Sequence, residues 1–248
     1  MFKKLLIPAL CGVASLAIAE PQRAVLTTEN KFPELRQLEV GYDFTSTEYD
    51  TSKFRSHEFV ARYGLLENLT ARLHVPFNTI DPDFGDKEEG IGDVRLGLDL
   101  VAYQDVFSFP YAIPHVEVSF PTGDEDKNLG TGDNMVKVGL AIGTVTHEVL
   151  HWVADFTYAI NTDSKAAVDD DIFSAALSLI WDVSDRFAVS GEGLVQDREN
   201  TSSNPVLLGA GLNYKWTPSF QTRFFMGVWN DSADGEDIVL NFNAAYTF

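Results

Sequence analysis

Apolar and polar residues alternate along most of this chain. Residues 69 to 78 read L-T-A-R-L-H-V-P-F-N, and residues 94 to 102 read V-R-L-G-L-D-L-V-A, so nearly every second side chain is apolar. Successive side chains of a strand point to opposite faces of a sheet, and this period of two therefore predicts strands with one apolar face. Beyond the N-terminus, no window approaches the ~18 consecutive apolar residues of a spanning helix.

Twelve such segments follow one another between turn signals, at about residues 35–45, 54–64, 68–78, 91–103, 109–120, 132–144, 148–160, 171–181, 186–196, 205–216, 219–229 and 237–248. Long polar stretches such as 79–90 follow the odd-numbered segments, and short ones such as 65–67 follow the even-numbered segments. Outer-membrane barrels have this asymmetry between external loops and periplasmic turns. We therefore expect an all-β fold over residues 34–248, a transmembrane antiparallel up-and-down β-barrel of about 12 strands. A soluble barrel or sandwich is the alternative, because alternation alone shows only that one face is buried.

Aromatic residues support the membrane interpretation. They close many of the predicted strands, where a barrel carries its interfacial girdles: Tyr63, Trp181, Trp216 and Tyr246 on even strands, and Phe44, Phe77, Phe120 and Tyr158 on odd ones. The chain ends I-V-L-N-F-N-A-A-Y-T-F. This ending, with Tyr246 and Phe248 on one face, resembles the C-terminal signal by which the barrel-assembly machinery recognises its substrates.

The N-terminus has the pattern of a secretory signal. Lys3 and Lys4 precede the apolar run 5–19, which closes on A-I-A. A membrane anchor is the alternative, but fifteen apolar residues are too few to span a bilayer. We expect cleavage after Ala19, so that residues 1–19 are a signal peptide and residues 20–33 a short periplasmic segment, too short for a TonB-type plug domain.

Composition and charge narrow the compartment and the partners. The 248 residues carry a formal net charge of −19, which excludes an electrostatic nucleic-acid binder. The single cysteine, Cys11, lies within the predicted signal peptide, so the mature chain has no disulfide. An exported, acidic chain without cysteine is typical of the Gram-negative periplasm or outer membrane. In the outer membrane, lipid and lipopolysaccharide are the surrounding partners. Acidic clusters in the predicted loops are either solvated or bind divalent cations at that surface.

The polar face of the predicted strands would line the lumen. It carries both signs of charge in near balance, whereas a porin for acidic sugars would be expected to have a basic wall. These residues form either a selectivity filter for a small-molecule solute or an internal salt-bridge network that partly plugs the barrel. The lumen and selectivity candidates are Arg62, Arg72, His74, Arg95, Asp99, His115, Glu117, Lys137, His151, Asp155, Glu192, Lys215 and Arg223.

Apolar residues also fall on the inward face, and they either accept a small hydrophobic or aromatic solute or simply pack: Val60, Ile113, Val153, Ile180, Leu194 and Phe225. The inward histidines come from different strands without the spacing of metal ligands, so no metal site is predicted. The sequence contains no motif that indicates a cofactor.

Four short motifs give a family resemblance. Residues 63–69 read Y-G-L-L-E-N-L, and G-I-G-D (90–93), P-T-G-D (121–124) and G-T-G-D (130–133) follow in that order. They are similar to the motifs of the outer-membrane transporter family "MetA-pathway of phenol degradation". The resemblance implies a barrel that passes small hydrophobic or aromatic compounds.

The function that the sequence favours is a passive outer-membrane channel for small solutes. An outer-membrane enzyme acting on lipid is one alternative, although no G-x-S-x-G motif is present. A non-conducting structural or adhesive barrel is the other, and predicted loops of about 8 to 12 residues are short for an adhesive surface.

Overall fold

The structure is a computed structural model, and it describes residues 21–49, 51–105, 110–162, 171–198, 204–231 and 235–248. The predicted signal peptide and its cleavage site lie outside the described residues. Within these ranges, no helix is long and apolar enough to cross a membrane. The one helical element described is a 3-10 turn, η1, at Glu125–Lys127.

Long antiparallel strands make up the described chain, as the alternation predicts. They are β1 (Leu38–Tyr49), β2 (Ser52–Leu66), β3 (Leu69–Pro82), β4 (Glu88–Ile91), β5 (Val94–Leu100), β6 (Tyr103–Gln104), β7 (Tyr111–Phe120), β8 (Met135–Thr146), β9 (Leu150–Asn161), β10 (Asp171–Ser184), β11 (Phe187–Arg198), β12 (Val206–Thr217), β13 (Phe220–Asp231) and β14 (Gly235–Thr247).

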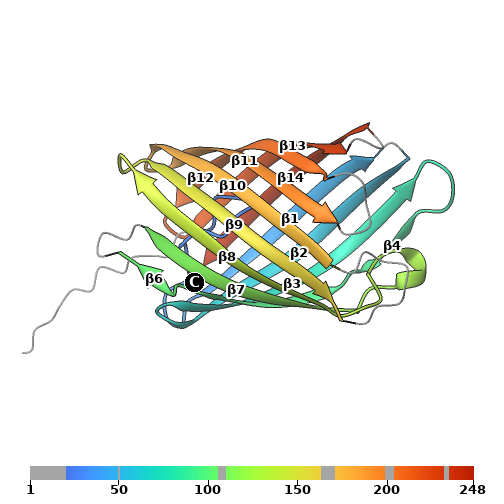
Figure 1. Cartoon of the computed structure of the whole chain (residues 1–248), viewed down its shortest axis with the longest axis horizontal. Coiled ribbons are helices and arrows are strands. Elements are labelled where there is room, and N and C mark those ends of the chain that lie inside the picture. Colours follow the sequence, from blue (N-terminus) through green and yellow to red (C-terminus); the bar gives the residue numbers. More distant parts are fainter. Residues whose placement is uncertain (1–20, 50, 106–109, 163–170, 199–203, 232–234) are drawn as a thin grey trace, which may run out of the picture.

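The sheet closes on itself. Apart from the short strands β4, β5 and β6, each strand pairs with the next along the chain, and β1 pairs with β14 from Glu39↔Thr247 to Glu48↔Ile238. β4 and β5 both pair with β3, and β5 and β6 both pair with β7, so these three short strands form one interrupted crossing. The described strands thus make the predicted barrel of twelve crossings, seen from the side in Figure 1. Closure satisfies every edge, which a sheet in hydrocarbon requires.

The two ends of the barrel differ. Short turns at 67–68, 147–149, 185–186 and 218–219 lie at the same end as Leu38 and Thr247, where β1 and β14 begin and end; we call this the turn end. At the opposite, loop end lie β4 and η1 (right in Figure 1). Barrels of this kind place the short turns in the periplasm.

One predicted loop is much shorter than expected. The sequence suggested a long polar stretch between residues 45 and 54, but β1 and β2 stay paired as far as Tyr49↔Ser52. Polar residues continue the hydrogen-bond ladder beyond the apolar belt, because a strand needs only a partner and not an apolar face to persist in water.

The outer wall is apolar around the barrel. Large apolar side chains are exposed there on successive strands, for example Phe59, Leu96, Leu140, Phe156 and Leu212, each between 39% and 49% exposed. A surface of this extent needs an apolar environment, which the hydrocarbon of a membrane supplies.

Inside the barrel lies the chain that precedes β1. We call residues 21–33 the luminal segment. Arg23, Ala24, Thr27, Glu29 and Pro33 are buried, and the segment contacts strands on the far side of the lumen. The sequence had placed residues 20–33 in the periplasm as a free segment; in the structure, residues 21–33 occupy the lumen.

Candidate functional site

The luminal segment enters the barrel over a glycine at the turn end. Leu35 forms an isolated bridge with Gly64, and the N–H of Arg36 donates to the Gly64 carbonyl at 2.8 Å. A Cβ on Gly64 would lie 1.9 Å from the carbonyl oxygen of Glu34. Only glycine permits so close a backbone approach. The glycine of the Y-G-L motif therefore seats the entry of the segment.

Apolar residues of the segment pack on the apolar inward residues of the wall. Ala24 belongs to a buried cluster with Ile180 and Ala188. Val25 and Leu26 pack on a second cluster around Phe225. Phe32 packs on a third, which is built from Tyr111, Ile113, Ala141 and Val153. Packing is what the structure shows for Ile113, Val153, Ile180 and Phe225, whereas Val60 borders open space.

Glu192 on β11 holds the middle of the segment. One carboxylate oxygen accepts the N–H groups of Val25 and Leu26, both at 2.8 Å, and the Ser178 hydroxyl at 3.0 Å. The other accepts the Ser190 hydroxyl at 2.9 Å. A carboxylate with four donors is fully compensated for its burial.

Asp155 on β9 holds the next turn of the segment. Its Oδ2 accepts the Thr28 N–H at 3.0 Å, and its Oδ1 lies 2.9 Å from Nε2 of His115. The Thr27 hydroxyl donates to the Ser178 hydroxyl at 2.9 Å. The segment is thus held by neighbouring strands through both its backbone and a side chain.

A buried ion pair folds the segment back on itself. Arg23 contacts Glu29 at 3.0 Å and also bonds to Asp182, whose other oxygen lies 2.7 Å from Nε2 of His151. Burial raises the pKa of the Glu29 carboxyl, but the guanidinium of Arg23 and the N–H groups of Arg23 and Ala24 outweigh burial and hold that pKa below its ordinary value. Burial likewise lowers the pKa of Arg23, and Glu29 and Asp182 raise it by more, so this side chain stays charged.

Side chains of β12 and β13 donate hydrogen bonds to the segment from its other side. Asn213 donates to the carbonyl of Arg23 at 3.0 Å, Gln221 donates to the carbonyl of Gln22 at 3.3 Å, and Arg223 donates to the carbonyl of Ala24 at 2.6 Å. The backbone of Gln22–Ala24 is therefore fixed across the lumen by side chains of the wall.

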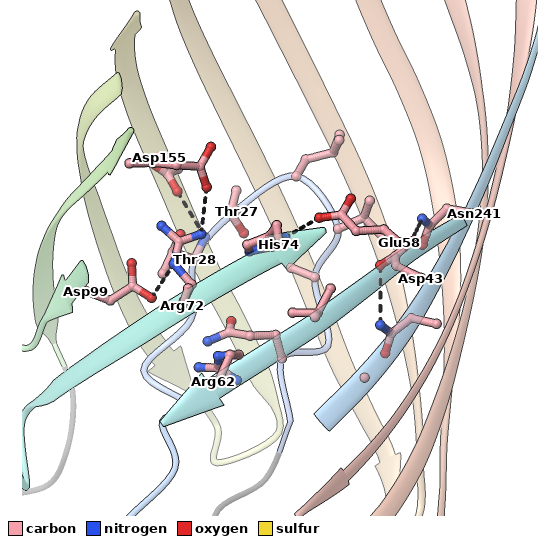
Figure 2. Close-up of a pocket in the computed structure, with 18 of the residues that line it drawn as sticks. Thr27, Thr28, Asp43, Glu58, Arg62, Arg72, His74, Asp99, Asp155 and Asn241 are labelled. Carbon is pink, nitrogen blue, oxygen red and sulfur yellow. Dashed lines mark hydrogen bonds and ion pairs between the residues drawn. The ribbon is translucent and has the colours of Figure 1, made fainter. Parts of the chain in front are cut away.

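A cavity of about 450 Å³ lies between the luminal segment and the barrel wall, and its lining includes residues of β1 to β3, β5, β7 to β11, β13 and β14; we call it the central cavity. Figure 2 shows Thr27 and Thr28 of the segment facing Arg72, His74 and Glu58 across it. The cavity is of the size that binds small molecules in proteins.

Ion pairs on β2, β3, β5, β7 and β8 form the wall opposite the segment. Arg72 lies 2.9 Å from Asp99 and 3.4 Å from Glu117. Arg95 bonds to Glu58 at 2.6 Å, and His74 bonds to the same carboxylate. Lys137 lies 3.4 Å from Glu117. We call these seven residues the ion-pair network. An internal salt-bridge network was one of the two interpretations of the polar face, and this set of ion pairs corresponds to it.

The structure places the sequence candidates as follows. Ten line the central cavity: Arg62, Arg72, His74, Arg95, Asp99, His115, Glu117, Lys137, Asp155 and Arg223. Glu192 holds the segment, His151 bonds to Asp182, and Lys215 lines a second cavity at the turn end. Tyr246 and Phe248 are exposed at the turn end with their rings 4.8 Å apart, and their role in assembly stays a prediction.

Sequence reasoning missed the residues that meet in the lumen from the segment side. Arg23 and Glu29 were not considered, and neither were Asp182 and Ser178. One signal was available in the sequence. Four residues on the otherwise polar inward face have apolar side chains, and all four are fully buried: Ile113, Val153, Ile180 and Phe225. An apolar patch on the wall of an aqueous lumen needs a cover.

The remaining motifs fold the chain at the loop end. Asp93 of G-I-G-D accepts the N–H of Gly123 at 3.0 Å and the N–H and hydroxyl of Thr131 at 2.8 and 2.9 Å. A Cβ on Gly130 would lie 2.3 Å from the Asp93 carboxylate. One aspartate thus ties G-I-G-D to P-T-G-D and G-T-G-D, as side chains of this type do in turns.

Comparison with known proteins identifies the family. The family described as "Putative MetA-pathway of phenol degradation" matches residues 30–248. The chain belongs to this family. The resemblance that the four motifs suggested is therefore confirmed, and the match includes the whole barrel but only the end of the luminal segment.

Solved structures share the fold of this family member. An outer membrane channel from Pseudomonas putida F1 is 17% identical with a TM-score of 0.72, and the similarity covers 92% of this chain and 100% of that one. The NanC porin is 8% identical with a TM-score of 0.61, covering 84% and 98%. The KdgM porin in complex with disordered oligogalacturonate is 10% identical with a TM-score of 0.58, covering 84% and 99%. No curated protein matches the sequence.

The location follows from the fold, the apolar outer wall and the family. The protein resides in the outer membrane of a Gram-negative bacterium, with its wall in contact with lipid.

Proposed function

We propose that the protein is a passive channel of the outer membrane, and that small aromatic molecules carrying a polar group, of the phenol class, are among its solutes. The observation that carries the proposal is the central cavity, which lies inside a closed barrel and is lined by charged and amide side chains. A barrel of twelve crossings is wide enough for a narrow lumen.

The lining of the cavity supports a small solute with some polarity. The most apolar part of the wall is covered by the luminal segment, so the open surface consists mainly of Arg, Glu, Asp, His and Asn side chains. A phenol-like molecule matches this surface, because its hydroxyl can exchange hydrogen bonds with these groups while its ring keeps the molecule small. The family's description, with its reference to phenol degradation, supports the same class.

The balance of charge argues against a channel dedicated to acidic sugars. Within the ion-pair network, Arg72, Arg95 and Lys137 are offset by Glu58, Asp99 and Glu117. A wall that attracts polyanions would need an excess of basic residues. Oligogalacturonate, with which the KdgM porin forms a complex, is therefore not among the solutes that we propose for this chain.

The alternatives receive less support. The similar solved structures are channels and porins and not enzymes. His57, which follows Ser56 in the sequence, bonds to the hydroxyl of Tyr42 on the outer face. Contacts with lipopolysaccharide and with the barrel-assembly machinery complete the proposal as partners.

Conductance of the refolded mature protein in a planar bilayer tests the proposal. We expect small, steady steps that phenol reduces reversibly and that a linear trisaccharide, too large for the cavity, leaves unchanged. Folding is verified beforehand by the altered gel mobility of the unheated barrel. A folded protein that never conducts would overturn the channel. Conductance that is indifferent to phenol would overturn the solute class alone.

A further inference from the structure

A second cavity lies at the turn end, beyond the luminal segment. It measures about 630 Å³, and its lining includes Arg23, Asp182, Arg186, Asn213, Lys215 and Gln221. We call it the turn-end cavity. Its residues come from the turns after β8 and β10 and from the ends of β12 and β13, so it lies on the periplasmic side of the central cavity.

The backbone of Gln22–Ala24 separates the two cavities. Gln22 and Ala24 line the central cavity, and Arg23 between them lines the turn-end cavity. Asn213 and Gln221 bond to this backbone and to each other, at 3.4 Å. We call the backbone of Gln22–Ala24 together with these two amides the septum.

The ion pair between Arg23 and Asp182 lies at this septum. The side chain of Arg23 is 7% exposed and that of Asp182 is 29% exposed, so the pair borders open space in the turn-end cavity while the guanidinium is otherwise enclosed. His151 bonds to the other oxygen of Asp182 at 2.7 Å, and Glu29 bonds to the other side of Arg23. The amides of the septum are neutral; its charged contacts are this pair, with Glu29 behind Arg23, and Arg223, which donates to the carbonyl of Ala24 at 2.6 Å.

Resting on the proposed channel function, we propose that the two cavities are the two halves of one solute path, and that the Arg23–Asp182 pair at the septum is the constriction that sets its ion selectivity. Fixed charge acts most strongly on a permeating ion where the path is narrowest and water is fewest. The ion-pair network borders the central cavity, where a permeating ion keeps more of its water. Charge at the septum therefore outweighs equal charge on the network.

Reversal potentials in a salt gradient test this assignment. Arg23→Gln removes a positive charge and should shift the permeability ratio of K⁺ to Cl⁻ toward the cation by about fivefold, whereas Asp182→Asn should shift it toward the anion. Arg23→Lys keeps the charge and should retain the wild-type ratio. The matched control is Lys137→Gln, which makes the same charge change on the wall of the central cavity and should move the ratio by less than about twofold.

Each outcome decides between the assignments. Opposite shifts from the two septum variants, each larger than that of Lys137→Gln, support the constriction. Equal shifts from Arg23→Gln and Lys137→Gln would overturn the constriction and leave the channel intact. Folded variants that are all silent would overturn both proposals.

Discussion

The two sides of the lumen contain similar residues and use them differently. On the side of β9 to β13, the carboxylates of Asp155 and Glu192 accept backbone N–H groups of the luminal segment. On the side of β2 to β8, the carboxylates of Asp99 and Glu117 are paired with arginine and lysine side chains of the wall. The first side holds the segment by its backbone, whereas the second lines the central cavity with ion pairs; Asp155 and Arg223 of the first side also border that cavity.

The difference teaches what an inward charge can do in a barrel of this width. A carboxylate that meets a backbone orders a piece of chain, whereas a carboxylate that meets side chains of neighbouring strands stiffens the wall and keeps space open. Both arrangements satisfy the burial of charge. Which one forms is decided by the apolar residues nearby, because Ile180 and Phe225 attract the segment to their side.

Truncation of Phe225 is expected to have the largest effect. Its ring is fully buried between the wall and the segment, so Phe225→Ala should lower the free energy of unfolding by about 3 to 5 kcal/mol. Urea unfolding in lipid vesicles measures it. The matched change on the open side, Val60→Ala, borders the central cavity and should cost about 1 kcal/mol or less. Equal losses would mean that the two sides are equally packed.

A disulfide should lock the segment to its side. The hydroxyl oxygens of Thr27 and Ser178 are 2.9 Å apart, so the double variant Thr27→Cys, Ser178→Cys should oxidise readily. It should raise the free energy of unfolding by about 2 to 4 kcal/mol relative to its reduced form. The predicted mature chain has no other cysteine, and thiol titration therefore reports the bond directly. Two thiols that stay free under oxidant would contradict the position of the segment.

Removal of Glu192 should loosen the segment without opening the barrel. Glu192→Ala leaves the N–H groups of Val25 and Leu26 without their acceptor, at a cost of about 1 to 3 kcal/mol. Hydrogen exchange of these two amides should accelerate accordingly. Glu58→Ala, the matched change in the ion-pair network, should leave their exchange unchanged. Acceleration by both variants would show that the two sides act as one unit.

Low pH should destabilise the luminal segment by a smaller amount, which grows as the pH falls. The pKa of Glu29 is lowered in the folded protein, so its contribution is fully present above the ordinary glutamate pKa and is lost as the pH falls through the lowered value. The protection factors of the amides in residues 21–33, which correct for the intrinsic pH dependence of exchange, should therefore fall below the ordinary pKa. Glu29→Gln should flatten that dependence, and a variant that keeps the full wild-type slope would assign it to another carboxylate.

The sequence predicted the wall well because the wall obeys a local rule. Thr70, Arg72 and His74 alternate with apolar residues, and a period of two translates directly into inward and outward faces. Asp93 stands in one of the four motifs, but its hydrogen bonds reach Gly123 and Thr131, 30 and 38 residues away, so these contacts follow no local rule. The short first loop was not predicted either, because polar residues of β1 and β2 pair as well as apolar ones.

The luminal segment was not predictable in this way. Its anchors are backbone N–H groups, which every residue except proline carries, so Val25 and Leu26 show no trace in the sequence of their bond to Glu192. The partners are also separated by 167 and 166 residues. In the sequence Asp155 and Asp99 are alike, since both are inward aspartates near a histidine or arginine. Only the path of the preceding chain distinguishes an anchor from a member of the network.

The burial of Pro21 governs how the protein can be handled. Pro21 is the first described residue, it is buried, and it lines the central cavity. An affinity tag or fluorophore fused directly ahead of it would begin inside the pore, where it would report on, or obstruct, the very passage under study. Phe248, by contrast, is 72% exposed on the outer wall. Labels on this protein belong in the connections at the loop end, where they leave both termini as they are.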